Sequence, residues 1–147
     1  MKTSNATYLA LNTYTKLMRA AESVTNRTSR LMNDAGLTIS QFGVLEALHH
    51  KGSLCQRDIA AKILKSAGNI TLVIDNLEKR GLVRRERDSE DRRYFTIRLT
   101  NEGAALIAQV FGRVKDAIVS EMSSITLPEQ EQLGSLCKKL GLKGGTP

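Results

Sequence analysis

The hydrophobic pattern of this 147-residue chain changes its period at Gly81, and this change constrains the fold more than any other feature. Before Gly81, apolar residues recur every three or four positions, as on the buried face of an α-helix. After Gly81, they alternate along two short segments, 82–87 and 94–99, as on half-buried β-strands. The sequence therefore predicts consecutive helices that lead into one β-hairpin, a mainly α fold with a small β component.

A helix over residues 38–51 is predicted by its two ends. Thr38 and Gln41 have the spacing of a capping box, in which each side chain satisfies a free backbone N–H of the other residue. Gly52 suits the position just after a helix, where a left-handed backbone is common. Between these ends lies an apolar stripe of Phe42, Leu45 and Leu48.

Two shorter helices are predicted between this helix and the hairpin. Ser53-Leu54 is a brief connection that can make a single strand pairing, and a helix over 56–64 follows it. Ser66 is a good N-cap for the next helix, which ends at Arg80. The expected buried face of this last helix consists of Ile70, Val73, Ile74 and Leu77.

Long helices flank this central region on both sides. No Pro or Gly interrupts residues 5–33, and a helix of that length needs something to cover its apolar stripe, for which a partner chain is a natural candidate. A long helix also follows Gly103, and a second capping box, Thr126 with Glu129, starts the last helix. The expected apolar stripe of this last helix is Leu133, Leu136, Cys137 and Leu140.

Positive charge concentrates around the predicted hairpin. The formal net charge is +7, and residues 51–98 carry twelve Lys and Arg against seven Asp and Glu. Most basic residues between Lys79 and Arg98 are arginines, which favour bidentate contacts with phosphates and bases. A solvated basic face is the simpler interpretation, but the density of arginine favours contact with a phosphate backbone.

Composition argues against several other classes of protein. Aromatic residues make up 4% of the chain, which argues against an aromatic platform for single-stranded nucleic acid. Two cysteines, Cys55 and Cys137, are too few for a disulfide scaffold or a four-ligand zinc site. The N-terminal segment is a poor signal peptide, and no stretch approaches the roughly 20 apolar residues that span a bilayer. We therefore expect no membrane partner.

Motifs that carry catalysis are missing from the sequence. We find no phosphate loop, no His–carboxylate zinc spacing and no nucleophile elbow. His49 and His50 are adjacent, so on a helix they point about 100° apart and make a poor pair of metal ligands. We expect no enzymatic activity, no metal and no cofactor.

Two helices joined by a short connection and followed by a basic hairpin form a winged helix-turn-helix. A helix fits the major groove of DNA, and an arginine-tipped hairpin fits the narrow minor groove. The predicted partner is therefore duplex DNA, with a winged helix that binds RNA or protein as the alternative. The candidate DNA contacts are Ser66, Gly68, Asn69, Thr71, Leu72 and Asn76 on the helix and Arg87, Arg92 and Arg93 on the hairpin.

These segments together resemble the MarR family of bacterial winged helix-turn-helix transcription regulators. The most specific similarity is Asp88-Ser89-Glu90-Asp91-Arg92-Arg93, which matches the family's Asp-x-x-Asp-Arg-Arg wing. The family's Leu-Thr-x-x-Gly motif follows at Leu99-Thr100-Asn101-Glu102-Gly103. The resemblance covers nearly the whole chain, which would then be a single domain over residues 1–147.

The resemblance implies a cytoplasmic homodimer that binds a pseudo-palindromic operator, usually as a repressor. Residues 5–33 and 104–141 would form the dimer interface, and residues 38–100 would form the DNA-binding lobe. Arg92 or Arg93 would reach the minor groove, Asp91 would orient an arginine, and Asp75 could pair with the wing.

The family also implies release from DNA by a signal, either a small aromatic ligand or an oxidant. Arg19, Phe42 and His49 could line an effector cleft, although a core Phe42 with surface Arg19 and His49 is the simpler interpretation. The stretch Gln41–Gly52 resembles the quinone- and phenol-responsive branch. Cys55 stands where the family often has Ser or Thr as an N-cap. A helix N-terminus lowers the pKa of a thiol while nearby Asp58 opposes this effect, so Cys55 is a redox candidate.

Overall fold

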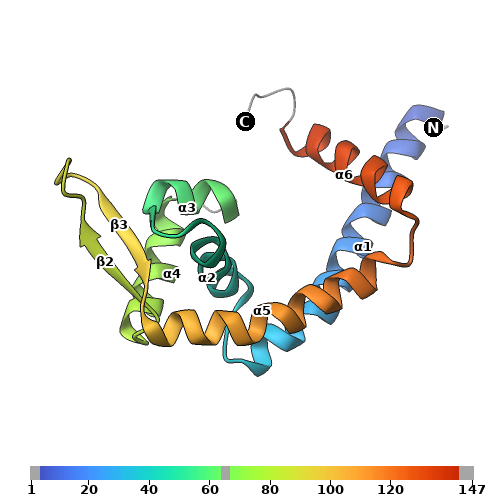
Figure 1. The fold of residues 1–147 in the computed structure, drawn as a ribbon. Helices are drawn as coiled ribbons and strands as arrows, with labels where there is room; N and C mark the ends of the chain where they lie inside the picture. The colour runs from blue at the N-terminus through green and yellow to red at the C-terminus, as the bar shows by residue number, and fades with distance from the viewer. Residues whose placement is uncertain (1–3, 64–66, 143–147) are drawn as a thin grey trace. The chain divides into compact units, whose positions relative to one another are not determined.

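The computed structural model describes residues 4–63 and 67–142, and the chain comprises two compact units, residues 1–114 and 115–147. The fold is mainly helical with one small antiparallel sheet, as predicted (Figure 1). The elements in chain order are α1 (Asn5–Asp34), α2 (Ile39–Lys51), β1 (Leu54–Cys55), α3 (Gln56–Ile63), α4 (Ala67–Lys79), β2 (Val83–Arg87), β3 (Phe95–Leu99), α5 (Asn101–Met122) and α6 (Leu127–Leu142).

The sheet has three strands in the order β1-β3-β2. β2 and β3 form the predicted hairpin, in which Arg85 lies opposite Ile97. The short connection after α2 makes the strand pairing that the sequence allowed, because Leu54 lies opposite Ile97 on the other edge of β3. The sheet therefore ties the start of α3 to the base of the hairpin.

The starts of α2 and α6 lie where the sequence predicts them, whereas α5 begins at Asn101, before its predicted start after Gly103. Thr38 and Gln41 form a complete capping box at the start of α2, and Thr126 and Glu129 exchange the same pair of hydrogen bonds at the start of α6. Gly52 and Gly81 have φ angles of 77° and 71°, a left-handed conformation that favours glycine.

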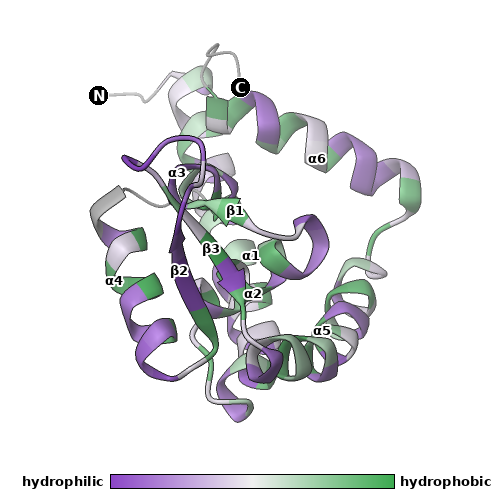
Figure 2. Cartoon of the chain, turned by 60° about the vertical axis from the view of Figure 1, so that its left-hand side comes forward, coloured by the Kyte–Doolittle hydropathy of each residue, from purple (hydrophilic) through white to green (hydrophobic). Residues whose placement is uncertain are grey.

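The core of the first unit joins the winged helix to the start of α5. Ile59 from α3, Ile74 from α4, Ile97 from β3 and Ile107 from α5 are fully buried in one cluster. The predicted inward face of α4 is confirmed, with Val73 partly buried beside the buried Ile70, Ile74 and Leu77. Figure 2 shows the contrast in this unit between green inward-facing segments and the purple tip of the hairpin.

The Leu-Thr-x-x-Gly motif has a clear role at the junction of β3 and α5. Thr100 Oγ1 donates to the carbonyl of Gly81 at 2.6 Å and accepts from the N–H of Gly103 at 3.0 Å. A Cβ atom on Gly103 would lie 1.9 Å from the carbonyl oxygen of Leu82, so only glycine allows this approach. The motif therefore locks α5 against the segment that enters the wing.

The flanking helices α1 and α6 expose most of their apolar side chains. In α1 only Thr28 and Met32 are buried, while Tyr8, Leu9, Leu11, Tyr14 and Met18 are exposed. No residue of α6 is buried. We expected Cys137 to pack on the stripe of this helix, and this prediction is wrong for the single chain, because Cys137 and its neighbours Leu136 and Leu140 are exposed.

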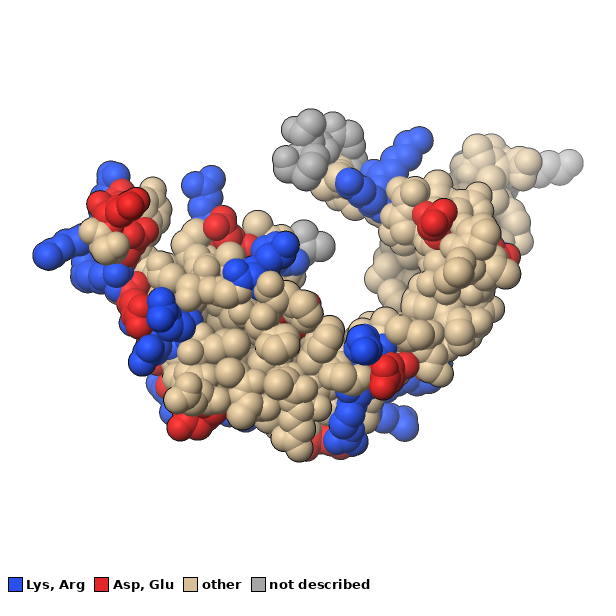
Figure 3. Space-filling model, in the orientation of Figure 1, with Lys and Arg blue, Asp and Glu red and all other residues tan. Residues whose placement is uncertain are grey.

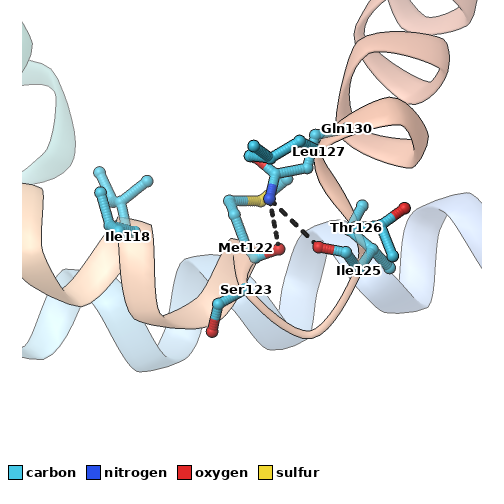
Figure 4. Close-up of a pocket in the computed structure, with 8 residues that line it drawn as sticks. Ile118, Met122, Ser123, Ile125, Thr126, Leu127 and Gln130 are labelled. Atoms are coloured by element: carbon cyan, nitrogen blue, oxygen red, sulfur yellow. Dashed lines mark hydrogen bonds between the residues drawn. The ribbon is translucent and has the colours of Figure 1, made fainter.

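A cavity of about 590 Å³ lies within the second unit, where α5 turns into α6 (Figure 4). Its walls are mainly apolar and include Ile118, Met122 and Leu127. Gln130 holds the turn by donating from Nε2 to the carbonyls of Met122 and Ile125, at 2.9 and 3.2 Å. Among the helices described, none is long and apolar enough to cross a membrane.

Candidate nucleic-acid interface

The outward face of α4 carries the short polar residues that the sequence proposed as DNA contacts. Asn69, Thr71, Leu72 and Asn76 are all exposed, and Leu72 is exposed by 62% although it is apolar. Gly68 lies in the first turn of α4, and Ser66 lies outside the described residues. The helix therefore presents a continuous solvent-facing surface opposite its buried face.

Thr71 is held from the neighbouring helix by a contact that sequence reasoning missed. Gln56, the first residue of α3, donates from Nε2 to Thr71 Oγ1 at 2.6 Å. The two residues are 15 positions apart, so no local spacing rule predicts the pairing.

The tip of the hairpin is ordered by its own aspartates. The carboxyl Oδ1 of Asp88 accepts from the N–H of Glu90 at 2.9 Å, and Oδ1 of Asp91 accepts from the N–H of Arg93 at 3.1 Å. In such Asx turns, an aspartate side chain accepts from the backbone N–H two residues later and orders the loop without strand pairing. The charged tip is therefore a defined structure.

Asp91 also holds the side chain of Arg93. The guanidinium donates from Nε to Oδ1 at 3.0 Å and from Nη2 to Oδ2 at 2.8 Å, a bidentate pair. The hydrogen bonds from the side chain and the backbone of Arg93 lower the pKa of the Asp91 carboxyl, and the pairing raises the pKa of the Arg93 guanidinium. The side chain of Arg93 is nevertheless 83% exposed, so it is oriented but remains accessible.

The other two wing arginines differ in how they are held. Arg87 donates from Nη1 to the carbonyl of Arg92 at 2.9 Å, and its guanidinium lies 5.1 Å from the centre of the Phe95 ring. The Arg92 side chain is exposed and has no partner among the described residues. Arg87 thus braces the hairpin across its two strands, while Arg92 presents its charge to solvent.

Asp75 connects the outward side of α4 to the wing. Its carboxylate lies 2.6 Å from Nη2 of Arg85 on β2, so the pairing suggested for Asp75 is present. Arg85 also lies 3.1 Å from Glu78 and is only 19% exposed in its side chain. This two-carboxylate clamp fixes the angle between the helix and the hairpin.

Most of the basic residues between Lys79 and Arg98 are paired within the lobe itself. Six of these eight residues contact a carboxylate or carbonyl, and Lys79 and Arg92 are the two without such a contact among the described residues. Figure 3 shows blue and red side chains intermixed over the hairpin. Exposed pairs of this kind are weak, so their arginines can exchange a carboxylate for a phosphate at small cost.

Arg80 belongs to the junction with α1 and was not singled out by sequence. Its Nη1 donates to the carbonyl of Gly36 at 2.7 Å and lies 3.4 Å from Oε1 of Gln41. Gly36, with a φ of 75°, is the turn between α1 and α2. Arg80 therefore ties the end of α4 to the point where the first flanking helix ends.

The three residues proposed for an effector cleft have different environments. Phe42 is buried in the core, as the simpler interpretation held, so it is not available to a ligand in this structure. Arg19 is exposed on α1, and His49 is exposed near Phe111, with ring centres 6.0 Å apart. Neither the cavity beside α6 nor one of about 440 Å³ near Ser29 and Thr38 is lined by these residues.

Cys55 lies in β1 directly before α3 and is half-buried. Its position at the start of a helix is the one that the sequence predicts, and its thiol is free. Within residues 4–63 and 67–142, no group of three His, Cys, Asp or Glu side chains is placed to hold a metal ion.

A family comparison matches residues 37–95 of this chain to the MarR family. A relative, the HTH-type transcriptional regulator YkoM of Bacillus subtilis, is 33% identical over 90% of this chain and 86% of its own length. The matched family segment contains α2, α3, α4, β2 and the tip of the hairpin, and it ends at the first residue of β3.

Two solved structures share the fold and show what related proteins bind. The transcriptional repressor CouR bound to a 23-mer DNA duplex is 27% identical, with a TM-score of 0.75 over 86% of this chain and 89% of that chain. NadR in complex with 4-hydroxyphenylacetate is 26% identical, with a TM-score of 0.72 over 85% of this chain and 89% of that chain.

Proposed function

This chain belongs to the MarR family of DNA-binding transcription regulators, and we propose that it is a homodimeric repressor that a small aromatic molecule releases from its operator. The family consists of regulators rather than enzymes, in agreement with the absence of catalytic motifs. The observation that carries the proposal is the exposed polar face of α4 beside an ordered arginine-tipped wing. We place its action in the bacterial cytoplasm, at the nucleoid when it is bound to DNA.

In this proposal α4 enters the major groove. Asn69, Thr71, Leu72 and Asn76 face the base edges, and Gly68 lies in the first turn of α4, where the helix N-terminus approaches the backbone. Polar residues at such positions read donors and acceptors of the bases, while Leu72 suits an apolar contact. The clamp of Asp75 on Arg85 supports this geometry by fixing α4 against the wing.

The wing arginines have separate roles in the proposal. Arg93 enters the minor groove, because Asp91 already orients its exposed guanidinium and an ordered side chain loses less entropy on binding. Arg92, which has no partner among the described residues, contacts a phosphate. Arg87 positions the hairpin and adds positive charge near the backbone.

Dimerisation is supported by the exposed apolar side chains of the flanking helices. Residues 5–33 and 104–141 would bury these side chains against a second copy, at a gain of about 25 cal/mol per Å² of apolar surface. Two copies related by a twofold axis would place two recognition helices about 34 Å apart, in successive major grooves. The operator would therefore be a pseudo-palindrome.

A phenolic effector is favoured by the ligand of the related NadR complex, 4-hydroxyphenylacetate. Arg19 supplies an exposed cation that could bind a carboxylate, and His49 supplies a ring beside Phe111. This chemistry agrees with the resemblance to the quinone- and phenol-responsive branch. Oxidation of Cys55 is the alternative route of release.

The function is tested by selecting genomic fragments with the purified chain and measuring duplex binding at increasing salt. We expect half-sites about one helical turn apart and an affinity that falls steeply with salt, because phosphate contacts release counterions. Absence of duplex binding at low salt, or equal binding to duplex RNA, would favour the alternative of an RNA- or protein-binding module.

Release is tested separately on the selected operator. Phenolic acids should release the wild type and the Cys55→Ser variant equally if the signal is a ligand. Peroxide or quinone should release only the wild type if Cys55 is the sensor. Equal loss of binding in both proteins after oxidation would remove Cys55 from the mechanism.

A further inference from the structure

Tyr94 is an exposed aromatic residue of the wing to which the function proposed above assigns no role. The chain has three tyrosines, three phenylalanines and no tryptophan, and Tyr94 directly follows the two arginines of the tip. It is 50% exposed and lies outside the hydrophobic cluster that forms the core of the lobe. Packing within the lobe therefore does not account for an aromatic ring at this position.

The backbone of Tyr94 is fixed at the base of the tip. The N–H of Asp88 donates to the carbonyl of Tyr94 at 3.0 Å, and the N–H of Tyr94 donates to the carbonyl of Asp91 at 3.1 Å. Both bonds use main-chain atoms, so they do not depend on the side chain at position 94. The Tyr94 hydroxyl makes no hydrogen bond to the described residues. The ring can therefore be removed without loss of the bonds that order the tip.

The ring lies beside the guanidinium that we propose to enter the minor groove. The Cζ atom of Arg93 is 5.9 Å from the centre of the Tyr94 ring, within the range of a cation–π contact. Asp91 accepts from Nε and Nη2 of the same guanidinium, whereas Nη1 has no partner among the described residues. Nη1 therefore remains to donate to a base, and the ring accompanies it to the groove.

The dimensions of the minor groove determine what such a ring can meet. The groove of B-DNA is about 6 Å wide, so a side chain inside it is in contact with the walls. These walls are formed by deoxyribose rings, whose C2′ atoms carry only hydrogen. A ring held next to the inserted guanidinium therefore faces an apolar sugar surface. In RNA a 2′-hydroxyl occupies this surface.

We propose that Tyr94 packs its ring on a deoxyribose of the minor-groove wall and makes the wing selective for DNA over a strand that carries ribose. The face of the ring would cover a 2′-hydroxyl at this contact without offering it a hydrogen-bond partner, and burying an unpaired hydroxyl is unfavourable. The inference rests on the proposed binding of duplex DNA, to which it adds the residue that recognises the sugar.

The experiment uses the full-length chain and the duplex that it selects from a randomised DNA library. Each nucleotide of one half-site is replaced in turn by the ribonucleotide with the same base, which adds only a 2′-hydroxyl. Replacement at the contacted sugar should weaken wild-type binding at least about fivefold, the effect of burying an unpaired hydroxyl. Fluorescence anisotropy measures the affinity, and thermal unfolding of every variant is measured alongside.

Two variants separate contact by the ring from other roles of the residue. Tyr94→Ala should bind the unmodified duplex about tenfold more weakly, the effect of losing roughly 60 Å² of apolar contact, and should tolerate the ribonucleotide within about twofold. Tyr94→Phe is the matched control, since it keeps the ring and lacks only the hydroxyl, and it should keep the wild-type sensitivity. All three proteins meet the same duplexes, so any effect of the replaced sugar on the shape of the DNA is common to them.

Several results would overturn the inference. It fails if a folded Tyr94→Ala is weakened by the ribonucleotide as much as the wild type, because the ring then does not touch the sugar. It also fails if Tyr94→Phe loses the sensitivity, since the hydroxyl rather than the face of the ring would then make the contact. A wild type that binds its selected duplex but tolerates every ribonucleotide overturns this inference alone. A wild type that binds no duplex overturns the proposed function, and the inference falls with it.

Discussion

The winged lobe and the flanking helices α1 and α6 differ in where their apolar side chains lie. The lobe buries its apolar residues within one chain, and its wing pairs most of its charges internally. α1 and α6 leave their apolar stripes exposed, with two buried residues in α1 and none in α6. The lobe is therefore complete as a single chain, whereas the flanking helices have surfaces suited to a second copy.

The two regions therefore contribute to the free energy of unfolding in different ways. Core burial in the lobe does not depend on protein concentration, whereas burial between two copies does. Variants of the two regions should thus differ in whether their effects change with concentration.

The largest effect is expected in the lobe. Ile74→Ala removes a fully buried side chain and should lower the free energy of unfolding by about 2–5 kcal/mol at every protein concentration. Leu72→Ala, on the exposed face of the same helix, should change it by less than about 0.5 kcal/mol and weaken DNA binding instead. Urea unfolding at two concentrations measures both, and a similar loss in the two variants would contradict the assignment of the helix faces.

A slightly smaller effect is expected from the flanking helix. Leu136→Glu/Leu140→Glu places two charges on the exposed stripe of α6, where they would be buried between copies. We expect dissociation into monomers and DNA binding at least about 100-fold weaker, because the two half-sites are no longer linked. Sedimentation velocity and fluorescence anisotropy measure the two changes.

The matched control for this variant is Gln132→Glu/Ser135→Glu, which adds the same two charges to polar positions of α6. It should leave the dimer and DNA binding nearly unchanged. A dimer that survives in the leucine variant, or dissociates equally in the control, would show that the stripe is not the interface.

The sequence predicted what depends on local spacing. The change of period at Gly81 predicts the hairpin, and the spacing of Thr38 and Gln41 predicts the start of α2, since both depend on neighbouring residues. The contacts Gln56–Thr71 and Arg80–Gly36 could not be predicted, because they join residues 15 and 44 positions apart.

Cys137 shows a second limit of sequence reasoning. A periodic stripe indicates that a helix face will be buried, but not by which chain. We expected Cys137 to be packed, and in the single chain it is exposed. The same stripe remains consistent with burial by a second copy, which is why the two leucines of α6 are the sites to test.

A third prediction distinguishes the roles of Arg92 and Arg93 at the tip of the wing. Arg93→Ala should weaken operator binding about tenfold, the scale of losing one specific arginine contact, without changing the dimer or the unfolding midpoint. Arg92→Ala should weaken operator binding less, and by the same factor for all duplex sequences. It should also reduce the slope of log affinity against log salt concentration by about one, because one phosphate contact is lost. Equal effects on specific and random duplexes for both variants would remove Arg93 from the minor groove.

The smallest effect is expected from acid, at the exposed tip of the wing. Arg93 lowers the pKa of the Asp91 carboxyl through side-chain and backbone hydrogen bonds. The ionised carboxylate therefore holds Arg93 and the tip in place fully above the ordinary aspartate pKa of about 4. That order is lost only as pH falls through the lowered value. Between pH 7 and 5 the tip should therefore not change, whereas Asp91→Asn should loosen it at every pH by removing the charge that holds Arg93. A carboxyl NMR titration should give a lower midpoint for Asp91 in the wild type than in Arg93→Ala, and equal midpoints would mean that the pair does not persist in solution.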